Sequence, residues 1–99
     1  MRIPKRLKVG QRWYKVDVID KMWREGMMGN TNYNTARISV AKRSTITNQR
    51  YKQEDVYDTF WHELTHAILK DMGSKLESNE KFVCDFSSRL NKAILSARF

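Results

Sequence analysis

The residues best suited to chemistry form one short run, His62-Glu63-Leu64-Thr65-His66. Two histidines four positions apart on a helix project from one face, so both imidazoles can reach a single zinc ion. Each residue of an α-helix turns by about 100°, which directs Glu63 to one side of His62, towards a water bound to that metal. The spacing therefore predicts zinc-assisted hydrolysis of a peptide bond, with His62 and His66 as metal ligands and Glu63 as the general base.

The histidine content of the chain supports a shared role for this pair. His62 and His66 are the only histidines in the sequence. The alternative is a chance match of surface or core histidines, which is expected in fewer than about 1% of chains of this length. We therefore expect a metal site on the helix that carries the run.

A third metal ligand has to come from elsewhere, because catalytic zinc usually takes three protein ligands and leaves one position for water. Four downstream residues are candidates: Glu77, Glu80, Cys84 and Asp85. Glu80 lies three residues before Val83, at the edge of an apolar helical stripe, from where it can lean towards the first helix. Glu80 is therefore the preferred third ligand, and the other three residues stay alternatives.

A donor to a transition-state oxyanion would also be needed. Tyr33, Arg37, Tyr51 and Tyr57 have suitable side chains. A tyrosine in a small domain is more often structural, so none of the four is preferred.

Two helices are expected in the second half of the chain. The first spans residues 53–72, with Glu54 and Asp55 at its positive end and Gly73 as a stop. The second begins between residues 74 and 78, capped by Ser74 or Ser78. Its expected apolar stripe consists of Val83, Phe86, Leu90, Ile94 and Ala97.

Strands are expected in the first half, over residues 12–19, 29–33 and 37–41, where apolar and polar side chains alternate. Residues 20–28 are either a packed loop or a short helix, and residues 42–52 are a polar loop. Strands before helices imply a single α+β domain over residues 1–99, with a small antiparallel sheet of about three strands and both helices on or beside it. The strand 37–41 is either internal or an exposed edge to which an extended substrate could pair.

Length and charge set further bounds. A chain of 99 residues and 11.8 kDa is too short for two-domain enzymes, doubly wound cofactor folds or barrels. The net charge is +8, and residues 1–52 hold 13 basic and 3 acidic side chains, a balance of +10. We expect residues 1–11 to form a basic N-terminal arm. This basic half could attract nucleic acid or an acidic partner, or could simply be a solvated surface.

The sequence resembles the zincin metallopeptidases, above all the small phage- or prophage-encoded proteins near the ImmA/IrrE-type and SprT-like groups. The resemblance covers roughly residues 29–90: residues 29–33 with the strand that follows, the run around His62, and residues 79–83 on the second helix. It implies a zincin-like fold, a zinc ion held by His62, His66 and Glu80, catalysis by Glu63, and a protein or peptide substrate. The chain has no third histidine, no zinc-ribbon cysteines and no helix-turn-helix region.

The leading hypothesis is accordingly a zinc metalloendopeptidase. The alternative is a basic module that binds nucleic acid or protein and has a structural or vestigial zinc site. No apolar run approaches the roughly 20 residues of a membrane span, and the chain starts without a secretory signal. With the single cysteine Cys84, these features predict a protein of the cytoplasm, that of the host if the protein is phage-encoded, with no membrane partner.

Overall fold

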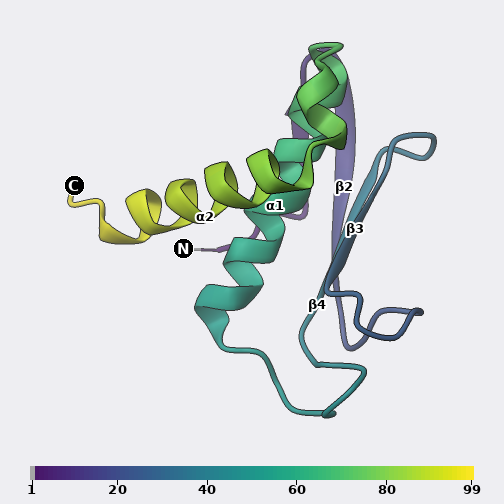
Figure 1. Cartoon of the computed structure of the whole chain (residues 1–99), viewed down its shortest axis with the longest axis vertical. Coiled ribbons are helices and arrows are strands. Elements are labelled where there is room, and N and C mark those ends of the chain that lie inside the picture. The colour runs from purple at the N-terminus through teal and green to yellow at the C-terminus, as the bar shows by residue number, and fades with distance from the viewer. Residues whose placement is uncertain (1) are drawn as a thin grey trace.

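Four strands precede two α-helices in the computed structural model, which describes residues 2–99 (Figure 1). The strands are β1 (Arg6–Val9), β2 (Arg12–Ile19), β3 (Gly29–Asn32) and β4 (Arg37–Ala41). Helix α1 (Gln53–Asp71), a short 3-10 helix η1 (Lys75–Ser78) and helix α2 (Glu80–Ser96) follow. The expected α+β class is confirmed, and residues 20–28 form a loop without a helix.

The sheet is mixed, with strand order β1-β2-β4-β3. Strand β2 pairs with β4 in parallel, whereas β1–β2 and β3–β4 are antiparallel. The expectation of about three antiparallel strands was therefore wrong in both number and direction. After β2 the chain leaves a gap one strand wide and forms β3 beyond it. The turn at residues 33–36 then brings β4 into the gap between β2 and β3. This places β4 inside the sheet and β3 at its edge.

Strand β1 lies within residues 1–11, the segment expected to form a basic N-terminal arm. Leu7 and the buried Val9 alternate with the exposed Arg6 and Lys8, so the segment has the period of two of a half-buried strand. Gly10, with φ of 60°, then turns the chain into β2. The sequence analysis predicted no strand in this segment, because its high charge concealed the alternation.

Helix α1 covers one face of the sheet, and α2 packs on α1 (Figure 1). The core between sheet and α1 is apolar, and its members are Val9, Tyr14, Val16, Ala36, Ile38, Val40, Val56, Phe60 and Ala67. The alternating side chains on the other face of the strands, among them Trp13 and Lys15, point away from the helices and are exposed. The molecule is therefore layered as sheet, α1 and α2.

The start of α2 differs from the expectation. Its N-cap is Asn79, whose side chain accepts a hydrogen bond of 3.0 Å from the Phe82 amide. Ser74 caps η1 instead, accepting from the Leu76 amide. This extra turn delays the helix, so that Glu80 becomes its first residue.

The face of α2 that packs on α1 also differs from the expected stripe. The buried residues of α2 are Val83, Ser87 and Asn91. Phe86 and Ile94, both placed in the stripe, are 48% and 40% exposed. Helix α2 thus packs a partly polar face on α1, and Glu80 at its N-terminal end lies against His62 and His66.

Candidate metal centre

The two histidines lie one turn apart on α1, with ring centroids 4.9 Å apart and edge-to-face packing. Their side chains are only 20% and 14% exposed for His62 and His66, respectively. Helical periodicity places them side by side. Glu80 and Cys84 of α2 lie against them. The helix therefore presents two imidazoles in a shielded position on one face.

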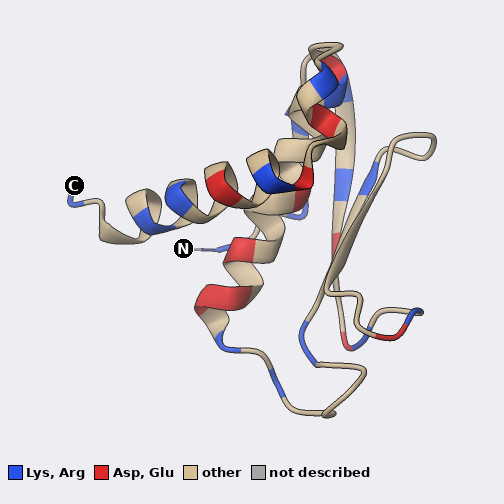
Figure 2. Ribbon diagram, in the orientation of Figure 1, with Lys and Arg blue, Asp and Glu red and all other residues tan. Residues whose placement is uncertain are grey.

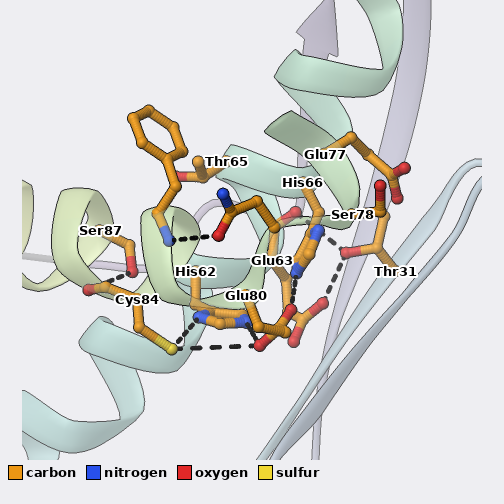
Figure 3. A network of polar contacts seen from close by, with 12 residues as sticks. Thr31, His62, Glu63, Thr65, His66, Glu77, Ser78, Glu80, Cys84 and Ser87 are labelled. Atoms are coloured by element: carbon orange, nitrogen blue, oxygen red, sulfur yellow. Dashed lines mark hydrogen bonds and ion pairs between the residues drawn. The ribbon is translucent and has the colours of Figure 1, made fainter. Parts of the chain in front are cut away.

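Glu80 closes this pair from the neighbouring helix (Figure 3). Its Oε1 lies 2.7 Å from Nε2 of His66, and its Oε2 lies 3.3 Å from Nε2 of His62. Both Nε2 atoms thus face one carboxylate. The structure brings together the three residues that the sequence analysis placed in the metal site.

The other candidates for the third ligand have different surroundings. Glu77 accepts a hydrogen bond of 2.6 Å from the Tyr33 hydroxyl. Asp85 pairs with Lys81 at 2.8 Å on the exposed face of α2, and this ion pair lowers the pKa of its carboxyl. Neither carboxylate has a contact with the histidines, whereas Cys84 is close to His62.

The Cys84 thiol lies beside the other ring nitrogen of His62, Nδ1. Its Sγ lies 3.8 Å from Nδ1 of His62 and 4.0 Å from Oε2 of Glu80. The potential ligand atoms of these three residues all lie within 4.8 Å of one another, close enough to hold one metal ion. Burial, and then the charge of Glu80, raise the pKa of the thiol.

The two nitrogens of His62 separate two possible ligand sets. Nε2 belongs with His66 and Glu80, whereas Nδ1 belongs with Cys84. One imidazole offers only one nitrogen to a given metal ion, and the other commonly hydrogen-bonds to a supporting group. If Nε2 binds the metal, Cys84 therefore contacts the other ring nitrogen, Nδ1, and helps to orient the His62 ring.

The donor set fits zinc. Imidazole nitrogen, carboxylate oxygen and thiolate sulfur are the usual zinc ligands, and two N or O ligands at the tetrahedral angle lie about 3.3 Å apart. The His62–Glu80 separation of 3.3 Å already has this value, and the His66–Glu80 separation of 2.7 Å is a hydrogen-bond distance. The Glu80 side chain is 65% exposed and can open the second distance by rotation.

Glu63 lies beside this group but is buried. The Thr31 hydroxyl donates to it, with Oγ1 2.7 Å from Oε1 and 2.9 Å from the main-chain oxygen. Burial raises the pKa of the Glu63 carboxyl, while the Thr31 hydrogen bond and the two histidines act in the opposite direction. The site thus contains a second carboxylate, separate from that of Glu80 and made more basic by burial.

Close packing of β3 against α1 positions Glu63. A Cβ atom added to Gly29 would lie 2.6 Å from Cγ2 of Thr59 and 3.1 Å from Cγ of Glu63. Such distances leave room only for hydrogen at this position of the strand. Gly29 and Thr31 were missed in the sequence analysis, because their roles depend on a contact between distant parts of the chain.

A cleft of about 620 Å³ opens over these residues. Its walls are the loop from Arg24 to Met28, the start of β3, and the facing surfaces of α1 and α2. Asp58, one turn before His62, also lines it; burial raises the pKa of this carboxyl, and its Oδ1 has no hydrogen-bond partner among the described residues. The cleft is therefore acidic and lies directly beside the histidines.

None of the four candidate oxyanion donors faces this cleft. Tyr33 is hydrogen-bonded to Glu77, and Arg37 pairs with Asp17 at 2.8 Å. Tyr51 and Tyr57 line a separate cavity of about 330 Å³ beside the N-terminal segment. The structure assigns these four residues to other contacts.

Comparison with known proteins adds no relative. No family model matches the sequence, and neither the curated proteins nor the solved structures include a match. Within residues 2–99, neither helix combines the length and apolar character that a membrane crossing requires. The geometry of the site is therefore what indicates its function.

Proposed function

We propose that the protein is a zinc-dependent peptidase of the zincin type, with His62, His66 and Glu80 as metal ligands and Glu63 as general base. One observation carries the proposal: Nε2 of both histidines faces the Glu80 carboxylate, and the buried Glu63, from the same helix as the histidines, lines the same cleft. A hydrolytic zinc site needs three protein ligands and a separate base.

Bound zinc would act as a Lewis acid and lower the pKa of a coordinated water. Glu63 accepts a proton from the attacking water and delivers it to the leaving amine. The hydrogen bond from Thr31 fixes the direction of its carboxylate. Burial raises its pKa, which brings the base closer to the pH at which it works.

The edge strand β3 offers a place for the substrate backbone. Of the two alternatives for residues 37–41, the structure has the internal strand, because β4 lies between β2 and β3. Strand β3 pairs on one side only, which leaves its outer N–H and C=O groups for an extended peptide. It also begins at the cleft, and Thr31 within it contacts Glu63. A peptide added to β3 would pass alongside the proposed base.

The second candidate is a binding module with a structural zinc site, and Cys84 is the observation that favours it. A zinc ion with four protein ligands has no position for water and is typical of structural sites. In the peptidase, Cys84 contacts Nδ1 of His62 and the Glu80 carboxylate and binds no metal itself. The two functions therefore make opposite predictions for Cys84.

Zinc content and cleavage test the proposal. Protein purified without chelators is expected to contain about one zinc per chain, and His62→Ala to lose it. Glu63→Gln should keep zinc and lose cleavage, measured by comparing new peptide termini in a lysate treated with each protein. Glu77→Gln is the matched control, because Glu77 hydrogen-bonds to Tyr33 and is expected to leave zinc content and cleavage unchanged.

Cys84→Ser separates the two functions. If the protein is a peptidase, the Cys84→Ser variant should retain close to one zinc per chain. If the site is structural and Cys84 is a ligand, the same variant should lose most of its zinc affinity. Wild-type protein without zinc, or cleavage by Glu63→Gln at the wild-type rate, would contradict the peptidase.

A further inference from the structure

The outer face of the sheet carries a second distinctive surface, far from the cleft. It is formed by Arg6 and Lys8 of β1 and by Trp13 and Lys15 of β2, all of which are exposed. Figure 2 colours the basic positions along these strands blue. Val9 and Tyr14 point into the core beneath α1, so the alternation of the strands turns these four side chains to the opposite face. We name these four residues the hairpin patch.

The aromatic member of the patch has two cations beside it. The Arg6 guanidinium carbon lies 4.8 Å from the centroid of the Trp13 ring, and Nζ of Lys8 lies 5.8 Å from it. The indole is still 53% exposed. A large apolar ring therefore stays in solvent, oriented by neighbouring positive charges.

The positive charge of the patch is not neutralised by the protein. Arg6 lies directly opposite Lys15 in the strand pairing, and like charges in this position are destabilising. Asp17, the nearest acid along β2, is paired with Arg37. Among residues 2–99, no ion pair involves Arg6, Lys8 or Lys15. An anion bound between the strands would relieve this repulsion.

We propose that the hairpin patch binds single-stranded nucleic acid, with a base stacked on Trp13 and phosphates at Arg6, Lys8 and Lys15. Single strands combine the two groups that the patch can use, because their bases are free to stack and their phosphates are spaced along the chain. An acidic peptide would use the cations but not the indole. The bases of a duplex are covered by their neighbours, so an indole on a sheet cannot reach them.

Binding of a fluorescein-labelled oligo(dT) of about 12 nucleotides, followed by anisotropy, tests the patch. With three phosphate contacts, log Kd should vary with log salt concentration with a slope of about 2 between about 50 and 200 mM. Lys15→Ala should reduce this slope by about 0.7. Oligo(U) should bind equally, because stacking and phosphate contacts are common to DNA and RNA.

Trp13→Ala is the decisive variant and should weaken binding by about 5- to 150-fold, the usual effect of losing one stacked base. Trp23→Ala is the matched control, since Trp23 is 65% exposed but lies in the loop after β2; its affinity should equal that of the wild type. Unchanged affinity of Trp13→Ala would overturn the proposal, as would equal or tighter binding of duplex or poly-glutamate. Circular dichroism checks that each variant is folded.

Discussion

The contact between β3 and α1 makes Gly29→Ala the most informative change in the molecule. The added Cβ would lie 2.6 Å from Cγ2 of Thr59, whereas carbon atoms in favourable contact are about 3.5–4.0 Å apart. Thr59 is β-branched and its hydroxyl donates to the Asp55 carbonyl at 3.0 Å, so its side chain cannot easily rotate away. Strand and helix therefore have to separate by about 1 Å.

The expected loss of stability is about 1–3 kcal/mol, as for other overpacked cores. Urea unfolding monitored by circular dichroism measures it, and for a slope of about 1–3 kcal/mol per molar urea the midpoint should fall by about 1 M. The separation also displaces Glu63, whose Cγ would lie 3.1 Å from the new Cβ. A displacement of about 1 Å in a catalytic group can reduce the rate about 100-fold.

Thr59→Ser provides the control, because it removes Cγ2 and keeps the hydroxyl that bonds to Asp55. In the double variant with Gly29→Ala, stability should recover, with a coupling energy of about 0.5–3 kcal/mol. Cleavage should recover less, because the contact with Glu63 persists. A Gly29→Ala protein as stable as the wild type, or a coupling energy of zero, would refute the assigned packing.

Two further changes test the neighbours of the site. Thr31→Val removes the donor to Glu63 and should lower the free energy of unfolding by about 1.5–3 kcal/mol, the range for a hydrogen bond to a charged group; an unchanged urea midpoint would contradict this role. Tyr33→Phe tests pH dependence, because burial and Glu77 raise the Tyr33 pKa above its ordinary value. The folded protein then keeps a proton that the unfolded chain loses above about pH 10, so stability falls above this pH. Tyr33→Phe should show a shallower fall in urea midpoints measured up to about pH 11, and equal slopes would exclude Tyr33 as the cause.

Local periodicity was enough to predict several elements correctly. The strand bounds of β2 and β4 and the start of α1 agree with the sequence analysis, because apolar side chains recur in the sequence there with the period of their element. The order and direction of the strands depend on where β3 returns along the sheet. That choice is made by contacts between distant residues such as Gly29 and Thr59, which a local pattern does not contain.

The site shows the same division. His62, Glu63 and His66 were predicted from spacing within one helix, and Glu80 from its position at the edge of the apolar stripe expected on the next helix. The orientation of α2 was less predictable, because its apolar residues include Phe86, which is 48% exposed. A polar stripe consisting of Glu80, Cys84, Ser87 and Asn91, at spacings of four, three and four, was the signal for the face that meets α1. Hydrophobicity alone misses a helix that packs around a polar centre.

The distribution of charge connects the two proposals. The cleft contains the carboxyl groups of Asp58, Glu63 and Glu80, which attract a divalent cation and repel phosphate. The hairpin patch lies on the opposite face of the sheet, where its cations attract phosphate. Its distance from the cleft keeps a bound nucleic acid away from the carboxyl groups there. A bound nucleic acid would therefore leave the free edge of β3 open to a peptide. This arrangement predicts that saturating oligo(dT) leaves the zinc content unchanged and does not inhibit cleavage, whereas a polyanion bound in the cleft itself would inhibit it.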